Sequence, residues 1–293
     1  GLAGLFATTT DGSTFVGAEA GQGITGAKLT GNDNTAVGKN AGLLLQGGAT
    51  ENTLMGSSAG AGVTTGTYNT SIGSDTLLGT CTGTYNTAVG YGALQIITSG
   101  VSNTCVGDRA GFAVLGGDNN LFLGNDAGRT GSPGGQIVNG DNEIVLGDEN
   151  IGEAHIQVDW TVASDARDKA DFTALDLGLD FVKALAPVTY KWDKRSKYGD
   201  KSAEDYDLNA QTPDGTHKED WLDIGFKAQE VEALEIAAGY NKDNKTNLIS
   251  SHTGDGKQMG LQYSKFVPIL VKAIQEQNAL IEALTARIVT LEG

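Results

Sequence analysis

The sequence predicts two architectures in one chain: a β-repeat shaft, then an α+β domain that ends in a long coiled-coil helix. Of the 43 glycines, 34 lie within residues 1–160. A five-residue unit recurs there at near-constant spacing, and apolar residues near the C-terminus follow a heptad. We therefore expect a shaft over residues 1–160, a second domain over residues 161–293, and a coiled coil over about residues 263–293.

The repeat has the form Asn-Thr-x-apolar-Gly, as in Asn69 to Gly73. Its closing glycines stand at positions 17, 38, 56, 73, 90, 107, 124 and 147, which gives steps of 17 residues in the middle and longer steps at the ends. A strict middle with atypical ends is typical of a solenoid. The Gly, Asn and Asp residues that bound each β-type run favour tight corners, because they tolerate left-handed backbone conformations.

One coil carries only one or two large apolar side chains in its β-type run, such as Val37 or Ile72. This pattern favours several identical chains wound around a shared axis as an intertwined β-helix, with a monomeric solenoid as the alternative. A small residue three positions after the glycine suits sites where chains pack closely: Ala20, Ala41, Ala59, Thr76, Ala93, Ala110 and Ala127.

The charge, the apolar runs, and the cysteines and histidines of the sequence together exclude several kinds of partner. The formal net charge is −16, so we expect no nucleic-acid binding, which needs a basic face. No apolar run approaches the roughly 20 residues that span a bilayer, so we expect no membrane insertion. Cys81 and Cys105 fit no disulfide or metal pattern, the three histidines lack ligand spacing, and we expect neither a metal nor a cofactor. The start at Gly1 suggests a piece of a longer protein.

Residues 13 to about 150 resemble the head repeats of trimeric bacterial surface adhesins and the shafts of phage fibres, on the strength of units such as Asn34-Thr35-Ala36-Val37-Gly38. Residues 164–293 are similar to the intramolecular chaperone domain of endosialidase tailspikes, L-shaped tail fibres and neck appendages, which also occurs in a eukaryotic membrane-bound transcription factor. Four segments in order carry that second resemblance: Ser164 to Lys169, Leu185 to Trp192, Ile224 to Glu232, and Tyr263 to Ile274.

The resemblance implies homotrimerisation, assisted folding of the upstream β-fibre, and a single self-cleavage by a serine/lysine dyad, with no substrate other than its own chain. The dyad would be Ser164 and Lys169, supported by Asp165 and Arg167, and the cut would fall between Ser164 and Asp165. The alternative is that Ser164 caps a helix whose first turn holds Asp165 and Asp168, while Lys169 is a solvated charge.

The chemistry of such a dyad sets two requirements. A serine hydroxyl needs a neighbouring base, and a lysine serves as one when burial lowers its pKa. Ser164 and Lys169 are five positions apart, so a turn between them has to bring hydroxyl and amine within about 3 Å.

Two features depart from the family pattern. Lys227 stands where an apolar residue is usual, and the polar stretch 193–220 is unusually long. We interpret this stretch as an exposed arm or hairpin that grips the shaft.

The last 30 residues give a separate oligomer signal. A heptad seam is formed by Ile274, Gln277, Ile281, Leu284, Ile288 and Leu291. Simple packing rules for Ile and Leu at these positions favour two strands, whereas the shaft and the resemblance favour three. We give more weight to the latter because they cover far more residues.

The leading hypothesis is a segment of a virion tail fibre or tailspike, exposed on the particle surface, whose chaperone drives trimerisation and then cuts itself off. The competing hypothesis is a receptor-binding adhesin or glycan-degrading tailspike that retains its trimerisation domain. A host-surface glycan or protein receptor would be its partner, and Tyr68, Tyr85 and Tyr91 could form a sugar-binding face. A membrane-tethered regulator is disfavoured because this piece shows no basic DNA-binding region and no membrane span.

Overall fold

The computed structural model describes residues 1–8, 11–201, 203 and 205–293. The chain divides into two compact units. Unit 1 comprises residues 1–152, 194–213 and 253–257, and unit 2 comprises residues 153–193, 214–252 and 258–293. The predicted fold class is confirmed: a β-solenoid is followed by a small α+β region that ends in a long helix.

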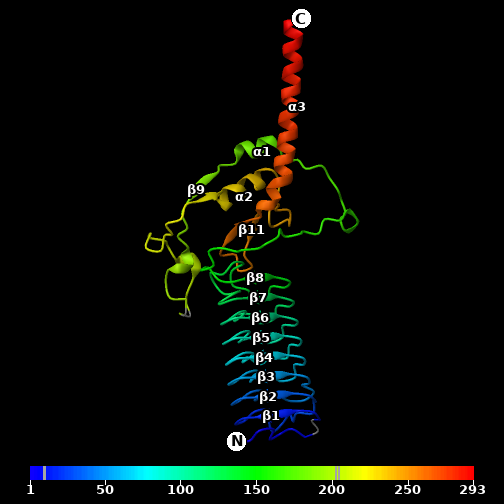
Figure 1. Cartoon of the computed structure of the whole chain (residues 1–293), viewed down its shortest axis with the longest axis vertical. Helices are drawn as coiled ribbons and strands as arrows, with labels where there is room; N and C mark the ends of the chain where they lie inside the picture. Colours follow the sequence, from blue (N-terminus) through cyan, green and yellow to red (C-terminus); the bar gives the residue numbers. More distant parts are fainter. Residues whose placement is uncertain (9–10, 202, 204) are drawn as a thin grey trace. The chain divides into compact units, whose positions relative to one another are not determined.

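Unit 1 is built on one parallel sheet of short strands that lie one above another (Figure 1). Each strand pairs in register with the next along the chain, so that Thr70 faces Thr87 and Ile72 faces Val89. The strands are β1 (Thr14–Val16), β2 (Thr35–Val37), β3 (Thr53–Met55), β4 (Thr70–Ile72), β5 (Thr87–Val89), β6 (Thr104–Val106), β7 (Leu121–Leu123) and β8 (Ile144–Leu146). The repeat units of the sequence, diverged copies included, are the strands of the sheet.

The glycine that closes each repeat has a positive φ and lies against the next coil. At Gly73, φ is 129°, and a Cβ atom there would lie 2.2 Å from the carbonyl oxygen of Gly90. No side chain fits at that distance, and L residues rarely adopt this φ. The repeat therefore requires glycine here for two independent reasons.

The single chain closes its own stack around a continuous core, which corrects the expectation that one chain has too few apolar side chains. The missing apolar volume comes from the connecting segments, where Leu45, Val63, Leu77, Leu94 and Ile97 are fully buried. The seven small residues three positions after the glycines are fully buried in this same core. They are small because the coil is narrow there, and not because chains meet there.

The asparagines of the repeat form a buried ladder instead of the corners we expected. Asn34, Asn52, Asn69, Asn86 and Asn103 are fully buried. Each side-chain amide donates to the Oδ1 atom of the asparagine one coil earlier, at 2.9 to 3.2 Å, from Asn52 through Asn120. The left-handed corner belongs to the preceding residue, as in Tyr68 and Tyr85, with φ of 60° and 59°.

Most of the polar stretch 193–220, which we expected to grip the shaft, contributes to unit 1: residues 194–213 belong to it, and the rest belongs to unit 2. Residues 194–213 contain the 3-10 helices η2 (Arg195–Lys197) and η3 (Leu208–Ala210). The Lys194 Nζ atom donates to the carbonyl oxygen of Glu149 at 2.9 Å, and Lys201 pairs with the carboxylate of Glu149. Ser196 and Leu208 are buried. This arm therefore packs on the last coils of the solenoid.

Unit 2 has its own small core. Its elements are η1 (Ala166–Asp168), α1 (Leu179–Ala184), β9 (Val188–Tyr190), β10 (Asp223–Gly225), α2 (Ala228–Ala237), β11 (Ser250–His252), β12 (Met259–Leu261), η4 (Tyr263–Lys265) and α3 (Phe266–Glu292). β9 pairs with β10, and β11 with β12, both antiparallel. Phe181, Val231, Ile249, Phe266 and Ile269 pack together in the core.

Two sequence expectations about unit 2 are resolved by its geometry. Lys227 lies outside β10 as the residue before α2, and its Nζ atom pairs with Glu230 at 2.7 Å, so the departure from the family pattern disturbs no strand. His252, expected at the surface, is half-buried and lies 2.6 Å from a carboxylate oxygen of Glu232.

The C-terminal helix α3 is buried only at its start. Phe266, Ile269 and Ala273 face the core of unit 2, whereas the predicted seam residues Ile274, Ile281, Leu284, Ile288 and Leu291 are between 52% and 79% exposed. Within the described part of the chain, no helix is long and apolar enough to cross a membrane. The seam is therefore an apolar stripe that this single chain leaves uncovered.

Candidate functional site: the Ser164–Lys169 pair

The structure brings together the two side chains predicted as a dyad. The Lys169 Nζ atom lies 2.6 Å from the Ser164 Oγ atom, within hydrogen-bond distance. The two residues flank η1, a single 3-10 turn over Ala166–Asp168. The turn required between positions five apart is thus present, and it shortens the path between hydroxyl and amine.

Asp165 and Arg167 fix this turn. The Asp165 side chain caps η1 by accepting a 2.9 Å hydrogen bond from the backbone N–H of Arg167. The Arg167 guanidinium in turn donates to both carboxylate oxygens of Asp165, to Oδ2 at 2.6 Å and to Oδ1 at 3.1 Å. These hydrogen bonds, first that of the guanidinium and then that of the backbone N–H, lower the pKa of the Asp165 carboxyl. The capping residue is Asp165 and not Ser164, which corrects that part of the alternative, whereas Lys169 is exposed as the alternative expected.

The pair lies in solvent in the single chain, where residues 161–170 are all exposed. A lysine becomes an effective base when it is desolvated, because burial disfavours the ammonium form. The geometry therefore meets the distance requirement of a Ser/Lys dyad, whereas the single chain does not meet the burial requirement.

Together, the two units define a class of protein: a β-solenoid shaft followed by an α+β domain that carries an adjacent serine and lysine and ends in a long helix. Residues 164–240, about a quarter of the chain, match the model of the family described as chaperone of endosialidase. This match begins at Ser164 and covers both members of the pair. No curated protein and no solved structure matches the chain.

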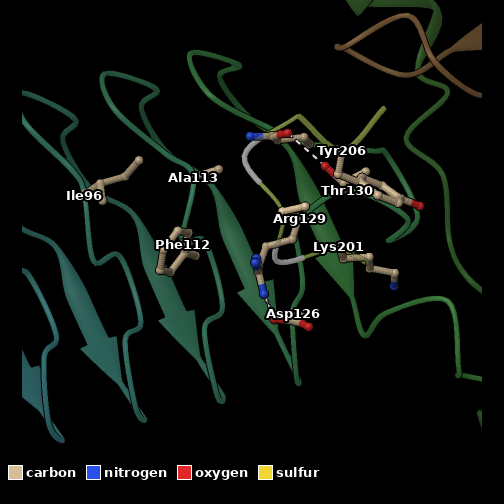
Figure 2. Close-up of a pocket in the computed structure, with 10 residues that line it drawn as sticks. Ile96, Phe112, Ala113, Asp126, Arg129, Thr130, Lys201 and Tyr206 are labelled. Atoms are coloured by element: carbon tan, nitrogen blue, oxygen red, sulfur yellow. Dashed lines mark hydrogen bonds and ion pairs between the residues drawn. The ribbon is translucent and has the colours of Figure 1, made fainter. Parts of the chain in front are cut away.

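A second candidate site is a pocket of about 220 Å³ in unit 1, which sequence reasoning missed (Figure 2). The solenoid contributes Phe112, Asp126 and Arg129 to its lining, and the arm contributes Lys201 and Tyr206. The Arg129 guanidinium lies 4.9 Å from the centre of the Phe112 ring and donates to Asp126 at 2.5 Å. The lining therefore combines an aromatic face with charges of both signs.

Two groups in this pocket are electrostatically unusual. Burial lowers the pKa of the Lys201 ammonium. The buried Tyr206 hydroxyl has no hydrogen-bond partner among the described residues. No local motif signals the pocket, because its solenoid residues and its arm residues are 65 to 110 positions apart in the sequence. Among the described residues, no cluster of three or more His, Cys, Asp or Glu could hold a metal ion.

Proposed function

We propose that the chain is a segment of a virion tail fibre or tailspike whose C-terminal chaperone, residues 161–293, drives homotrimerisation and folding of the shaft, residues 1–160. The chaperone then cuts itself off once, between Ser164 and Asp165. The observation that carries the proposal is the 2.6 Å contact between Lys169 and Ser164 at the first residues of the segment that matches the family.

The proposed chemistry assigns one task to each partner. Neutral Lys169 accepts the proton of the Ser164 hydroxyl, and its ammonium returns a proton to the amine that leaves. Attack by Oγ on the carbonyl carbon of its own residue would close a strained four-membered ring. A cut after Ser164 therefore takes its attacking oxygen from outside that residue. That oxygen comes either from a water whose proton passes to Lys169 through the Ser164 hydroxyl, or from Ser164 of a neighbouring chain, in which case water then hydrolyses the ester that forms.

Trimerisation supports this chemistry. The dyad is exposed in one chain, and so is the apolar seam of α3. Association along the seam buries apolar area, and neighbouring chains can exclude water from Lys169. Cleavage would then follow assembly, because the base is activated only after the chains have met.

We expect freshly folded wild type to yield two fragments, and Ser164→Ala and Lys169→Ala to stay whole. Loss of either dyad member removes the nucleophile or its base, so cleavage should fall by at least a thousandfold, in line with the cost of losing members of such catalytic units. Denaturing electrophoresis with intact-mass analysis measures both the extent and the position of the cut.

Asp168→Ala is the matched control, since Asp168 lies in the same turn and should leave cleavage intact. A wild type that stays whole under every folding condition would remove the protease assignment and leave a permanent trimerising domain. A cut between Ala163 and Ser164 would indicate an acyl shift through a five-membered ring, and the proposed position would be wrong.

The pocket in unit 1 favours receptor binding as a second candidate function. The Phe112 ring beside the Arg129–Asp126 pair offers stacking and hydrogen bonds of the kind that sugars use. On a glycan array, wild type should bind a restricted set of glycans, and Arg129→Ala should reduce that signal at least tenfold. Glu51→Ala, at an exposed corner away from the pocket lining, should not change it. An array without signal for wild type rejects glycan binding by this pocket.

A further inference from the structure

One face of the sheet carries an unbroken apolar stripe that unit 1 leaves open. In each strand the middle residue points into the core, so the first and third point outward. The third residues are all aliphatic and pair with one another in register: Val16, Val37, Met55, Ile72, Val89, Val106, Leu123 and Leu146. Six of these eight are between 37% and 55% exposed, and the two valines Val37 and Val89 are half-buried.

The strands themselves add no charge to this face. None of the residues in strands β1 to β8 is ionisable apart from the buried thiol of Cys105, and the first strand positions are mostly threonine. Acidic residues stand just outside the strands, at Glu19, Asp33, Glu51, Asp75, Asp108, Asp118 and Asp126. Copies of a chain with a net charge of −16 repel one another over most of their surface. The strand residues of this face add nothing to that repulsion.

We propose that the stripe is the surface on which the solenoids of three copies of this chain pack side by side. The proposal deepens the proposed function, because it rests on the homotrimer and names its contact surface in the shaft. A second copy fits the stripe better than a glycan does, since a glycan needs hydrogen-bonding groups that aliphatic side chains lack. In parallel copies of the same chain, the third residue of each strand also lies opposite the third residue of the same strand in the neighbouring copy.

The size of the stripe indicates that it cannot hold a trimer alone. Eight strands at about 4.8 Å spacing and three residues at about 3.3 Å give a face of roughly 34 by 10 Å. That is about 340 Å², less than half of the ~800 Å² per partner of a stable interface. Association along the exposed seam of α3 would supply the remaining binding free energy. Once the helices have associated, the shafts are tethered to one another, and tethering raises their effective concentration to the millimolar range.

Cysteine cross-linking of the full chain tests the proposal, in a Ser164→Ala background that keeps the chain whole. Mild oxidation of Ile72→Cys should give covalent dimers at twice 30.2 kDa, with one chain of each trimer left over. Leu78→Cys is the control on the same coil; Leu78 is 41% exposed but lies outside the sheet, and it should give at least tenfold less dimer. The native thiols are buried, which raises the pKa of Cys81 to about 11 and also raises that of Cys105, so neither should react.

Sedimentation of the same samples separates the two possible failures. A trimer near three times 30.2 kDa in which Ile72→Cys cross-links no better than Leu78→Cys overturns the stripe and leaves the homotrimer standing. A monomer overturns the homotrimer and the stripe with it. Ile72→Lys provides a second measurement: it should lower the melting temperature of the trimer more than Leu78→Lys does, and equal effects count against the stripe.

Discussion

Asn86→Ala is expected to destabilise the shaft by about 4 kcal/mol, since each buried polar group left without a partner costs about 1 to 3 kcal/mol. The Asn86 amide donates to Gly100 O at 2.7 Å and to the Asn69 Oδ1 atom at 3.2 Å. Its own Oδ1 atom accepts from the backbone and the side chain of Asn103, at 3.1 and 3.0 Å. Alanine removes all four bonds at a position with no access to water. Denaturation in guanidinium chloride, followed by far-UV circular dichroism, measures the loss.

Asn125→Ala is the control for this prediction. Asn125 is exposed on the same solenoid and makes one long side-chain bond, 3.4 Å from Asp108, so its loss should cost less than about 0.5 kcal/mol. Because each coil contacts mainly its neighbours, hydrogen exchange should speed up most in the coils on either side of position 86. Equal effects of the two substitutions would show that the ladder contributes little to stability.

The sequence was informative about the sheet because each strand carries its own local signal. The Asn-Thr-x-apolar-Gly unit marks the strand, and the closing glycine satisfies a backbone requirement that no other residue meets. The core was harder to predict, because the residues that fill it, such as Leu45 and Leu94, sit in irregular segments without periodicity. Counting only strand residues underestimated what one chain can bury.

The buried asparagine ladder could not be predicted from the sequence either. Asparagine in a Gly-rich segment is a common turn former, and the sequence could not tell a corner from a buried rung. The difference lies in one position: the left-handed residue is the one before the asparagine, for example Tyr85 before Asn86. The sequence alone does not show which of the two residues forms the corner. The hydrogen bonds that hold the asparagine amide inside the solenoid are made with residues 14 to 18 positions away, so they exist only once the neighbouring coils have formed.

The candidate dyad could be predicted from the sequence for a different reason. Ser164, Asp165, Arg167 and Lys169 lie within six positions, so a motif can specify them and one turn can join them. Their role in cleavage stays a prediction, because it depends on burial by other chains. The pocket near Arg129 and Tyr206 had no such signal, because its lining is brought together only when the arm packs on the solenoid.

Glu235→Ala is expected to cost unit 2 about 3 to 5 kcal/mol, because the Glu235 carboxylate is fully buried and holds three backbone N–H groups of another segment. One oxygen accepts from Leu248 and Ile249 at 2.7 and 2.6 Å, and the other from Ser250 at 2.9 Å. These bonds attach the start of β11 to α2. A glutamate in a helix usually points to solvent, and its partners follow 13 to 15 positions later, so no local pattern announces the contact.

Hydrogen exchange of the peptide that covers residues 248–250 measures this effect directly. A loss of about 4 kcal/mol corresponds to roughly a thousandfold faster exchange of these amides. Glu235→Gln keeps one acceptor oxygen and should fall between wild type and alanine. Glu230→Ala, which removes an exposed carboxylate from the same helix, should leave the exchange unchanged. If Glu235→Ala behaves like Glu230→Ala, β11 is held by its pairing with β12 and by the core around Ile249, and the buried carboxylate is not what orders it.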